Sequence, residues 1–444
     1  MSTPTTEVAG QESKPGLLIN RNYSLLFLGQ SVSALGDQLS TYTIILWIVT
    51  IIAPGQTWAP LAVSAVLITS MIPNLFIGPL AGVLVDRWNA RLTMMRMDAL
   101  RAVLALILIA FTGIIPLPFF AGGRPAPLVQ LMIICVITFL SSTCSQFFSP
   151  SNMSLLARIV PKKERPHAAS LGQTVQAFAT IVGPPLASPL LFAFGVQWAL
   201  AVDAGSFVVS LVTIWAIRVS MQDQAGAEAE QHTLWSDFVR GLRFSIKNSV
   251  IRTIIITSFI ATLGAGAFDA LYVFFLPDNL HVDASYTGII AAALGIGTIL
   301  GALVAAKISA RVGLGRLLAL SLFGIGLCLL IVSRLNVFAP ALVLFFLFGS
   351  LMASLRVASS PMLLNETPQG MIGRVFSALN STSIVASLVS ALFSGYLASV
   401  VLVNFHWQTL GTTFGPIDTI FTCVGLIFAL AALYAYRSLG SRKA

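Results

Sequence analysis

The sequence has few charged residues. Asp, Glu, Lys and Arg together make up 9% of its 444 residues, whereas 57% are apolar. Soluble proteins carry about 25% charged residues, so a soluble chain of this length would have too little polar surface to stay in water. The shortage of charge excludes soluble enzymes, coiled coils, disordered chains and nucleic-acid binders.

The residue patterns of several kinds of chemistry are also missing. The four cysteines lie in apolar stretches without the spacing of metal ligands, at Cys135, Cys144, Cys328 and Cys423. We expect small buried side chains there, and neither a disulfide framework nor a metal site. No glycine-rich phosphate loop with a lysine, zinc-type His/Glu spacing or nucleophile elbow occurs. We therefore expect no cofactor, no use of ATP and no enzymatic activity.

The chain is instead rich in long apolar runs. One membrane-spanning helix needs roughly 20 mostly apolar residues. Twelve such segments can be marked, at residues 24–52, 60–85, 97–115, 128–155, 168–193, 197–218, 250–276, 285–309, 315–333, 338–364, 374–403 and 415–437. They are too long for the strands of outer-membrane barrels. The sequence thus predicts an all-α membrane protein with twelve transmembrane helices.

One long polar break divides these segments six and six. We expect a polar tail at 1–22 that is not a cleaved signal, a six-helix bundle at 23–218, a linker at 219–249, a second bundle at 250–437 and a tail at 438–444. Near the end of the linker, at helical spacing, apolar side chains fall on one face and basic side chains on another. This spacing predicts an amphipathic helix on the membrane surface, with an ordinary loop helix as the alternative.

Basic residues are strongly biased to one side of the predicted membrane. An even number of helices places both termini on one side, and 23 of the 25 Lys and Arg residues lie on or nearest that side. The opposite loops hold only Arg124 and Arg334. Because loops rich in Lys and Arg stay in the cytoplasm, we expect both termini to be cytoplasmic and the protein to lie in the plasma (inner) membrane. The net charge of +9 then describes topology and not an acidic partner.

Short matches between the two halves indicate an internal duplication. A Leu-Leu, Pro, Arg pattern follows the fourth segment, at 155–165, and recurs after the tenth, at 363–374. Gly82-Val-Leu-Val after the second segment likewise recurs as Gly301-Ala-Leu-Val at the eighth. Two six-helix units related by duplication are an architecture found in transporters.

The most specific motif lies between the second and third segments. It reads Gly82-Val-Leu-Val-Asp86-Arg87-Trp-Asn-Ala-Arg91 and resembles the G-x-L-x-D-R-x-x-x-R loop of the major facilitator superfamily. A carboxylate among arginines can form charge-assisted hydrogen bonds that hold one end of a carrier closed. The resemblance implies a gate at the cytoplasmic mouth, formed by Gly82, Asp86, Arg87, Arg91 and, in the second half, Arg374.

Further segments are similar to the branch of this superfamily that exports siderophores, macrolides and other drugs. They include residues 21–37, residues 148–165 and the Gly183-Pro184 pair, which would bend the fifth helix. The antiporter pattern of that helix, G-x-x-x-G-P-x-x-G-G, is incomplete here, with Ala179, Ala187 and Ser188 in place of glycines. This departure weakens the implication of antiport specifically.

A few charged residues lie well inside the apolar segments, where a charge costs roughly 2.5–3.5 kcal/mol on insertion scales. Asp37, Asp269 and Arg356 lie in the first, seventh and tenth segments. The resemblance implies that the first, fourth, seventh and tenth helices line a central cavity, so these three residues would share it. We hypothesise that Arg356 pairs with one acid while the other carries a coupling proton. A static ion pair that joins helices is the alternative.

Two further charged sites receive structural interpretations. Asp203, near the outer end of the sixth segment, is expected to hydrogen-bond locally at the periphery. Asp98 and Arg101 are expected at the cytoplasmic end of the third helix, where they would support the loop motif.

Polar side chains form stripes at helical spacing on three segments. In lipid these stripes would be unfavourable facing outward, so we expect them to face protein or a water-filled cavity, although small polar residues also serve helix packing. The stripe residues assigned to the cavity are Ser33, Thr41, Gln146, Ser149, Asn152, Asn380, Ser383 and Ser387.

Together these features predict a secondary active transporter that works by alternating access. We expect a monomer in the lipid bilayer that exports a hydrophobic or amphipathic small molecule, similar to a drug, macrolide or siderophore, in exchange for protons. Uptake by symport and lysolipid flipping on the same fold are the alternatives. A polytopic membrane enzyme is a remote one, since no cluster of His, Asp or Glu marks a loop.

Overall fold

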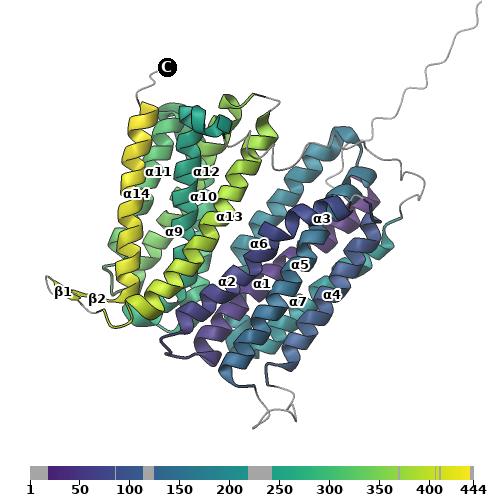
Figure 1. The fold of residues 1–444 in the computed structure, drawn as a ribbon, viewed down its shortest axis with the longest axis horizontal. Coiled ribbons are helices and arrows are strands. Elements are labelled where there is room, and N and C mark those ends of the chain that lie inside the picture. Colours follow the sequence, from purple (N-terminus) through teal and green to yellow (C-terminus); the bar gives the residue numbers. More distant parts are fainter. Residues whose placement is uncertain are drawn as a thin grey trace, which may run out of the picture.

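Long helices packed into two bundles make up the protein (Figure 1). The computed structural model describes residues 19–85, 87–113, 125–218, 243–368, 371–405, 407–409 and 412–440. The N-terminal bundle contains α1 (Arg21–Trp47), α2 (Ala59–Phe76), α3 (Gly78–Val85), α4 (Ala90–Ala110), α5 (Pro127–Ile159), α6 (Arg165–Phe194) and α7 (Val196–Ala216). The C-terminal bundle contains α9 (Ser249–Asn279), α10 (Thr287–Val312), α11 (Leu314–Val332), α12 (Phe338–Glu366), α13 (Ile372–Tyr396) and α14 (Pro416–Gly440).

Short elements complete the described chain. Single π-helical turns extend α1 and α13, at Ile48–Ile52 and Leu397–Val401, and 3-10 turns precede α6 and α10, at Lys162–Glu164 and Ala284–Tyr286. Strands β1 (Trp407–Thr409) and β2 (Thr412–Phe414) pair antiparallel between α13 and α14. Asp86, residues 219–242 of the linker, and both tails apart from residues 19–22 and 438–440 lie outside the described residues, and of the predicted amphipathic helix only the last part, at 243–247, is described and is helical.

Eleven of the described helical segments are long and apolar enough to cross a membrane. The helix α4 is also 21 residues long, but it carries Arg91, Arg96, Asp98 and Arg101. It begins seven residues before the predicted start at 97, because Asn89 caps it by accepting a hydrogen bond from the Leu92 N–H. With α4, the described chain has the twelve membrane helices that the sequence predicts.

The predicted second segment, 60–85, is divided into α2 and α3. The break falls at Ile77, next to Gly78 and Pro79. Pro79 has no N–H to donate to the preceding turn, and its ring disfavours the helical conformation of the residue before it. The second helix is therefore one membrane crossing made of two helical pieces.

The two bundles repeat one packing pattern. In the first, α1 packs on α6 and α7, α4 on α5 and α7, and α2 on α5; in the second, α9 packs on α13 and α14, α11 on α12 and α14, and α10 on α12. Each pair has its counterpart in the other half, which confirms the pseudo-symmetric bundles.

The glycines of the sequence repeat are not equivalent, however. Gly301 lies inside α10 and, with Gly297 one turn earlier, lets the backbone of α12 approach at Phe346 and Ser350. Gly82 meets open space. The Gly301 motif therefore serves close helix packing.

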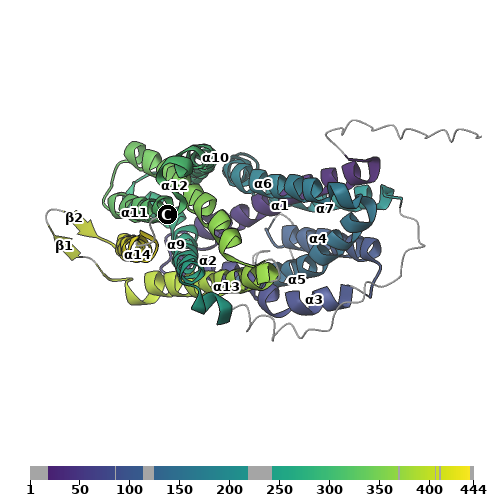
Figure 2. The same ribbon diagram turned by 90° about the horizontal axis from the view of Figure 1, so that it is seen from above.

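Contacts between the bundles lie at one end of the molecule. The helices α2 and α13 meet on one side of the junction and α6 and α10 on the other, as seen from above in Figure 2. The Leu61 N–H donates to Ser399 Oγ at 3.1 Å, and Ser188 Oγ donates to the Ser285 carbonyl at 2.5 Å. Gly395 adjoins Ser64, and Gly288 adjoins Ser188.

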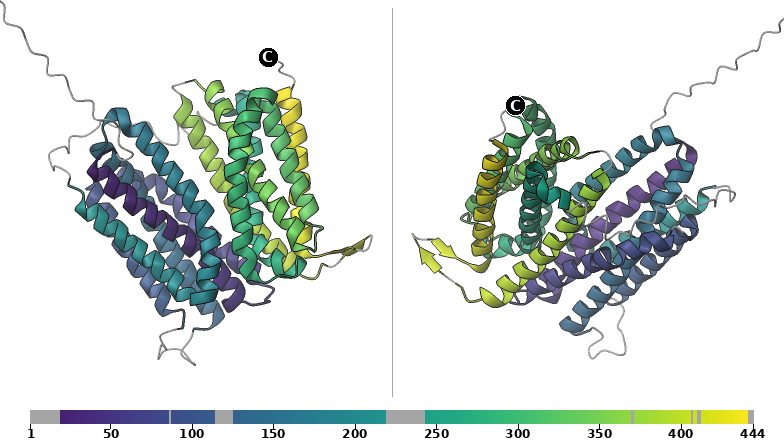
Figure 3. Two further views of the ribbon diagram at one scale, coloured as in Figure 1. Left: turned by 180° about the vertical axis from the view of Figure 1, so that it is seen from behind. Right: turned by 45° about the horizontal axis from the view of Figure 1, so that its top comes forward.

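These contacts come from the first half of α2 and α10 and from the last half of α6 and α13. They are therefore far from the helix ends at which α1 begins and α14 ends. Toward that other end the bundles lean apart (Figure 3). The structure is thus closed at one end and separated at the end where α1 begins and α14 ends.

Candidate functional site

A cavity lies between the two bundles near the middle of the helices. One part has a volume of about 530 Å³ and is lined by α2, α9, α12 and α13; an adjoining part of about 440 Å³ is lined by α1, α6, α9, α10 and α12. Both parts share Ala265, Asp269, Met352 and Arg356. We call them together the central cavity. Because both bundles line it, it is placed where a carrier with two bundles would bind its substrate.

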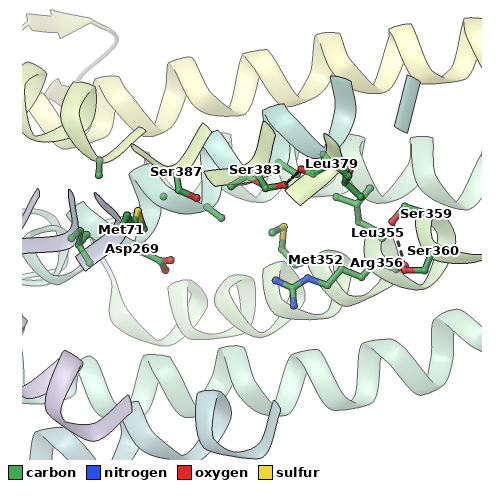
Figure 4. Close-up of a pocket in the computed structure, with 17 residues that line it drawn as sticks. Met71, Asp269, Met352, Leu355, Arg356, Ser359, Ser360, Leu379, Ser383 and Ser387 are labelled. Carbon is green, nitrogen blue, oxygen red and sulfur yellow. Dashed lines mark hydrogen bonds between the residues drawn. The ribbon is translucent and has the colours of Figure 1, made fainter. Parts of the chain in front are cut away.

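Asp269 and Arg356 are the charged groups that line the central cavity. Both side chains are exposed to it, Asp269 from α9 and Arg356 from α12. Figure 4 shows the Arg356 guanidinium extended into the same space as the Asp269 carboxylate. Among the described residues the only salt bridge joins Arg101 and Asp37, so Asp269 and Arg356 do not form one. Each can therefore bind an opposite charge on a ligand.

Apolar and hydroxyl side chains form the rest of the cavity wall. Leu67 and Met71 of α2 face Met352 and Leu355 of α12 across the larger part. Hydroxyl groups of Ser258, Thr262, Ser359, Ser360, Ser383 and Ser387 line the same part. A wall of this kind, apolar with a few polar groups, is typical of small-molecule sites.

A stacked aromatic cluster supports Asp269 on the side of the closed end. The ring of Phe268 lies 5.0 Å from Phe348 and 5.1 Å from Tyr272, measured between centroids, and 5.8 Å from Phe421. These rings join α9 to α12 and α14, and aromatic pairs of this geometry add to the energy of burial. The cluster fixes α9 in place, so the position of the Asp269 carboxylate is set by packing.

Asp37 does not share the central cavity, contrary to the prediction. It lies inside the N-terminal bundle, where its carboxylate forms the salt bridge with Arg101 of α4. Arg101 also donates to Ser141 Oγ at 3.4 Å, and its guanidinium lies 4.1 Å from the centre of the Phe207 ring. The acid therefore pairs with a base of its own bundle, and the prediction that Asp37, Asp269 and Arg356 share one cavity was wrong for Asp37.

Two other placements also need correction. Asp98 and Arg101 lie two to three turns inside α4 and not at its cytoplasmic end, since α4 begins at Ala90. Asp203 of α7 is 6% exposed and, with Asp37 and Arg101, lines a second cavity that lies within the N-terminal bundle. It is part of a buried polar cluster and not a peripheral residue.

The polar stripes divide between cavity and packing roles. Ser383 and Ser387 of α13 line the central cavity. Ser33 is buried, Thr41 Oγ1 donates to the Asp37 carbonyl at 2.8 Å, and Gln146 lies against Gly78 at the α2–α3 break. The remaining three, none of which lines the central cavity, are Ser149 and Asn380, which are exposed, and Asn152, which is half-buried.

The Gly183-Pro184 pair lies where α6 meets α1. The helix continues through Pro184 to Phe194. Gly183 adjoins Gln38 and the Leu39 backbone so closely that a Cβ would collide, and Pro184 lines the central cavity. The glycine therefore serves close packing on α1, while a bend of α6 in transport stays a prediction.

The described residues of the gate motif make separate contacts in this structure. Arg87 is exposed, and Arg91 donates from Nε to the Ile214 carbonyl at 3.1 Å and from Nη2 to the Trp215 carbonyl. These bonds tie the start of α4 to the end of α7. Arg374 contacts Met371 Sδ at 3.6 Å, and Asp86 lies outside the described residues.

The fold and this cavity define a class of protein. Two pseudo-symmetric bundles of six membrane helices around a shared polar cavity are the architecture of a membrane transporter. The sequence profile of the Major Facilitator Superfamily matches residues 26–383 and 254–443. The chain belongs to the Major Facilitator Superfamily, and it is a multi-pass membrane transporter of that family.

Similar proteins come from bacteria. The chain is 24% identical over 396 residues to the uncharacterized MFS-type transporter YkuC of Bacillus subtilis, covering 86% of this chain and 87% of YkuC. It is 23% identical over 259 residues to the enterobactin exporter EntS of Escherichia coli, covering 57% of this chain and 61% of EntS. The fold matches that of a bacterial homologue of the iron transporter ferroportin in its inward-facing state, with a TM-score of 0.69, 17% identity and coverage of 95% and 98% of the two chains.

Proposed function

We propose that this protein exports a hydrophobic or amphipathic small molecule across the plasma membrane in exchange for protons. One chain supplies both bundles and the whole cavity, so a monomer suffices. The observation that carries the proposal is the central cavity, which is lined by both bundles and lies beside inter-bundle contacts that are confined to one end. The similarity to an enterobactin exporter supports the direction of transport.

The basic residues indicate on which side of the membrane the separated end lies. Arg91, Arg165 and Arg374 all lie at the helix ends near the termini, and loops rich in Lys and Arg stay in the cytoplasm. We assign this end to the cytoplasm, so the structure has the inward-facing arrangement. Both termini are then cytoplasmic, and β1 and β2 lie outside.

The gate motif acts in the opposite state. Gly82 now meets open space, and a glycine permits the close approach of another helix. When the cytoplasmic ends come together, Gly82 gives room for the contact, and Asp86 binds arginines at the mouth. The inter-bundle contacts of Ser188 and Ser399 break in that state.

The wall of the cavity fits an amphipathic substrate. Met71, Met352 and Leu355 offer an apolar surface, and Asp269 and Arg356 each offer one charge. A substrate with an apolar body and a polar or ionised group would contact both. The membrane potential can drive uphill export, since one charge crossing 100 mV supplies about 2.3 kcal/mol.

The first experiment identifies a ligand. Purified protein is warmed with erythromycin, enterobactin or lysophosphatidylcholine, since a compound that binds the folded state raises the melting temperature. The compound that does so is then supplied, radiolabelled, to inverted membrane vesicles.

Export in exchange for protons predicts accumulation in inverted vesicles whose lumen is acidified, and the loss of accumulation when a protonophore removes the gradient. The Asp269→Asn variant should accumulate less of the compound. Accumulation only in right-side-out vesicles would show uptake by symport instead. Redistribution of lysophosphatidylcholine between leaflets, without release, would show lipid flipping.

A further inference from the structure

A second polar cavity lies inside the N-terminal bundle. Its volume is about 220 Å³, and α1, α2, α4, α5 and α7 line it. We call it the inner cavity. Among its lining residues are Asp37, Arg101 and Asp203, together with hydroxyl groups from α1, α2 and α5. A group of charges enclosed within one bundle of membrane helices is costly and calls for a functional reason.

The charges of the inner cavity do not balance if all its acids are ionised. Arg101 is the single base, and it forms its salt bridge with Asp37. Asp203 and Asp98 add two carboxyl groups, of which Asp98 is fully buried. One arginine balances one carboxylate, so the cluster is electrically neutral only when two of its three carboxyl groups carry protons. This neutral state is favoured because an uncompensated buried charge costs several kcal/mol.

The two remaining acids differ in access. Asp203 lines the inner cavity, is 6% exposed, and its Oδ1 has no hydrogen-bond partner among the described residues. Asp98 does not line the cavity, and neither of its carboxyl oxygens has a hydrogen-bond partner in the described part of the chain. The Asp203 carboxyl can therefore exchange a proton with water in the cavity, whereas the Asp98 carboxyl is fully buried and has no such access.

We propose that Asp203, together with the Arg101–Asp37 pair, binds and releases the coupling proton in the inner cavity, apart from the substrate in the central cavity. The inference rests on the proposed exchange for protons. In the state described, Asp203 is protonated and Arg101 pairs with Asp37. Release breaks the O–H bond of Asp203, and the proton passes to water. Arg101 then lies between two carboxylates and is shared by both, which draws α4 and α7 together.

Packing connects this cluster to the closed end of the protein. On α1, Gly36 adjoins Ser206 of α7, Asp37 pairs with α4, and Gln38 adjoins Gly183 of α6. Further along α6, Ser188 forms one of the bonds that join the bundles. Three consecutive residues of α1 thus contact three helices. A shift of Arg101 is therefore transmitted through α1 to α6, the helix that carries Ser188.

Other titratable groups do not replace Asp203 in this role. Cys144 of α5 faces Arg101 and Asp98, and a thiol is neutral in the range where carboxyl groups exchange protons. From α2, the hydroxyl-bearing Ser70 lines the cavity. Within the described residues no cluster of His, Cys, Asp or Glu has the arrangement to hold a metal ion.

Infrared spectroscopy tests the assignment without any substrate. The full-length protein in lipid nanodiscs is titrated from acid to alkaline pH, and the C=O stretch of protonated carboxyl groups is followed. We expect the wild-type spectrum to contain a titrating band that Asp203→Asn lacks, with a loss equal to one carboxyl group. Asparagine matches the shape of a protonated carboxyl, so this variant should fold. The matched control Asp269→Asn should keep the Asp203 band.

An unchanged titrating band in Asp203→Asn would overturn the proposal. A second variant gives an independent test, since Asp37→Asn leaves Arg101 to pair with Asp203. The Asp203 band should then vanish from the spectrum at neutral pH, and its persistence there would also contradict the proposal. Because no transported compound is involved, failure of the export proposal is recognised separately, by the vesicle experiment.

Discussion

The inner and central cavities each hold an acid and an arginine, but in opposite arrangements. In the inner cavity, Arg101 and Asp37 form a salt bridge within one bundle, and the arginine side chain is 8% exposed and the aspartate side chain 39%. In the central cavity, Asp269 and Arg356 are exposed and form no salt bridge with each other. Paired, enclosed charges hold helices together, whereas charges facing an open cavity remain available to a ligand. The difference separates a region suited to coupling from one suited to binding.

The largest effect should come from breaking the enclosed pair. We expect Arg101→Met to lower the free energy of unfolding by about 3 kcal/mol. It removes the base from a cluster of three carboxyl groups, of which Asp98 and Asp203 are buried and Asp37 is partly exposed. The double variant Arg101→Met/Asp37→Asn should recover more than half of this loss. Unfolding in mixed micelles measures both. Additive losses in the double variant would show that the salt bridge is not what stabilises the bundle.

The next largest effect concerns access to the central cavity. A side chain at Gly395 would collide with Ser64 at the closed end. We therefore expect Gly395→Val to destabilise the contact between the bundles at this end by about 2 kcal/mol. Spin labels at Gln56 and Asn404, one on each bundle, should then report a longer distance. Gly172→Val is the matched control, since Gly172 meets open space. Equal distances in both variants would contradict the assigned contact.

A smaller effect is expected from the open charges. Asp269→Asn should weaken binding of a cationic or zwitterionic compound about tenfold, which corresponds to about 1.4 kcal/mol, since one charge-assisted bond is lost. The melting temperature without ligand should change little, because the carboxylate has no partner to lose. Titration calorimetry and thermal unfolding separate the two readouts. A large loss of stability would instead make Asp269 a structural residue like Asp37.

The smallest effect is expected at the closed end, outside the membrane helices. The Ser285 N–H donates to the Asp283 carboxylate at 2.8 Å, and hydrogen bonds from Ser285 hold the pKa of Asp283 below its ordinary value. A lowered pKa stabilises the fold above about pH 4, the ordinary value for Asp, and this contribution is lost as the pH falls through the lower value.

We therefore expect Asp283→Asn to lower the free energy of unfolding by less than about 0.5 kcal/mol at neutral pH. Below the lowered pKa of Asp283 we expect no difference between the two proteins. Melting temperatures of both proteins across the acid range measure this difference. A difference that grows as the pH falls would have the wrong sign.

The fold could be predicted from the sequence because it depends on runs of apolar residues. Each membrane helix is recognised by its own length and composition, and the polar break at the linker divides the halves. The start of α4 could not be found in this way, since Arg91 and Arg96 interrupt the apolar run. A capping Asn89 before the helix was the signal that could have found it.

The two cavities were harder to predict than the helices. Asp269 and Arg356, found as charges inside apolar segments, and Ser383 and Ser387, found in the stripe on α13, all line the central cavity. The Arg101–Asp37 pair joins residues 64 positions apart, and which helices face each other is decided by packing over the whole bundle. The available signal was three acids and one arginine near the middle of neighbouring helices. This signal predicts a cluster only when it is known that those helices pack against each other.

The separation of coupling from binding is tested most directly by comparing two modes of transport in the same proteoliposomes. Exchange of labelled for unlabelled compound across the membrane needs the central cavity alone, whereas uphill accumulation driven by a pH gradient also needs the proton site. The account predicts that Asp203→Asn keeps exchange and loses accumulation, while Asp269→Asn impairs both. Proton-driven accumulation by Asp203→Asn at the wild-type level would contradict it.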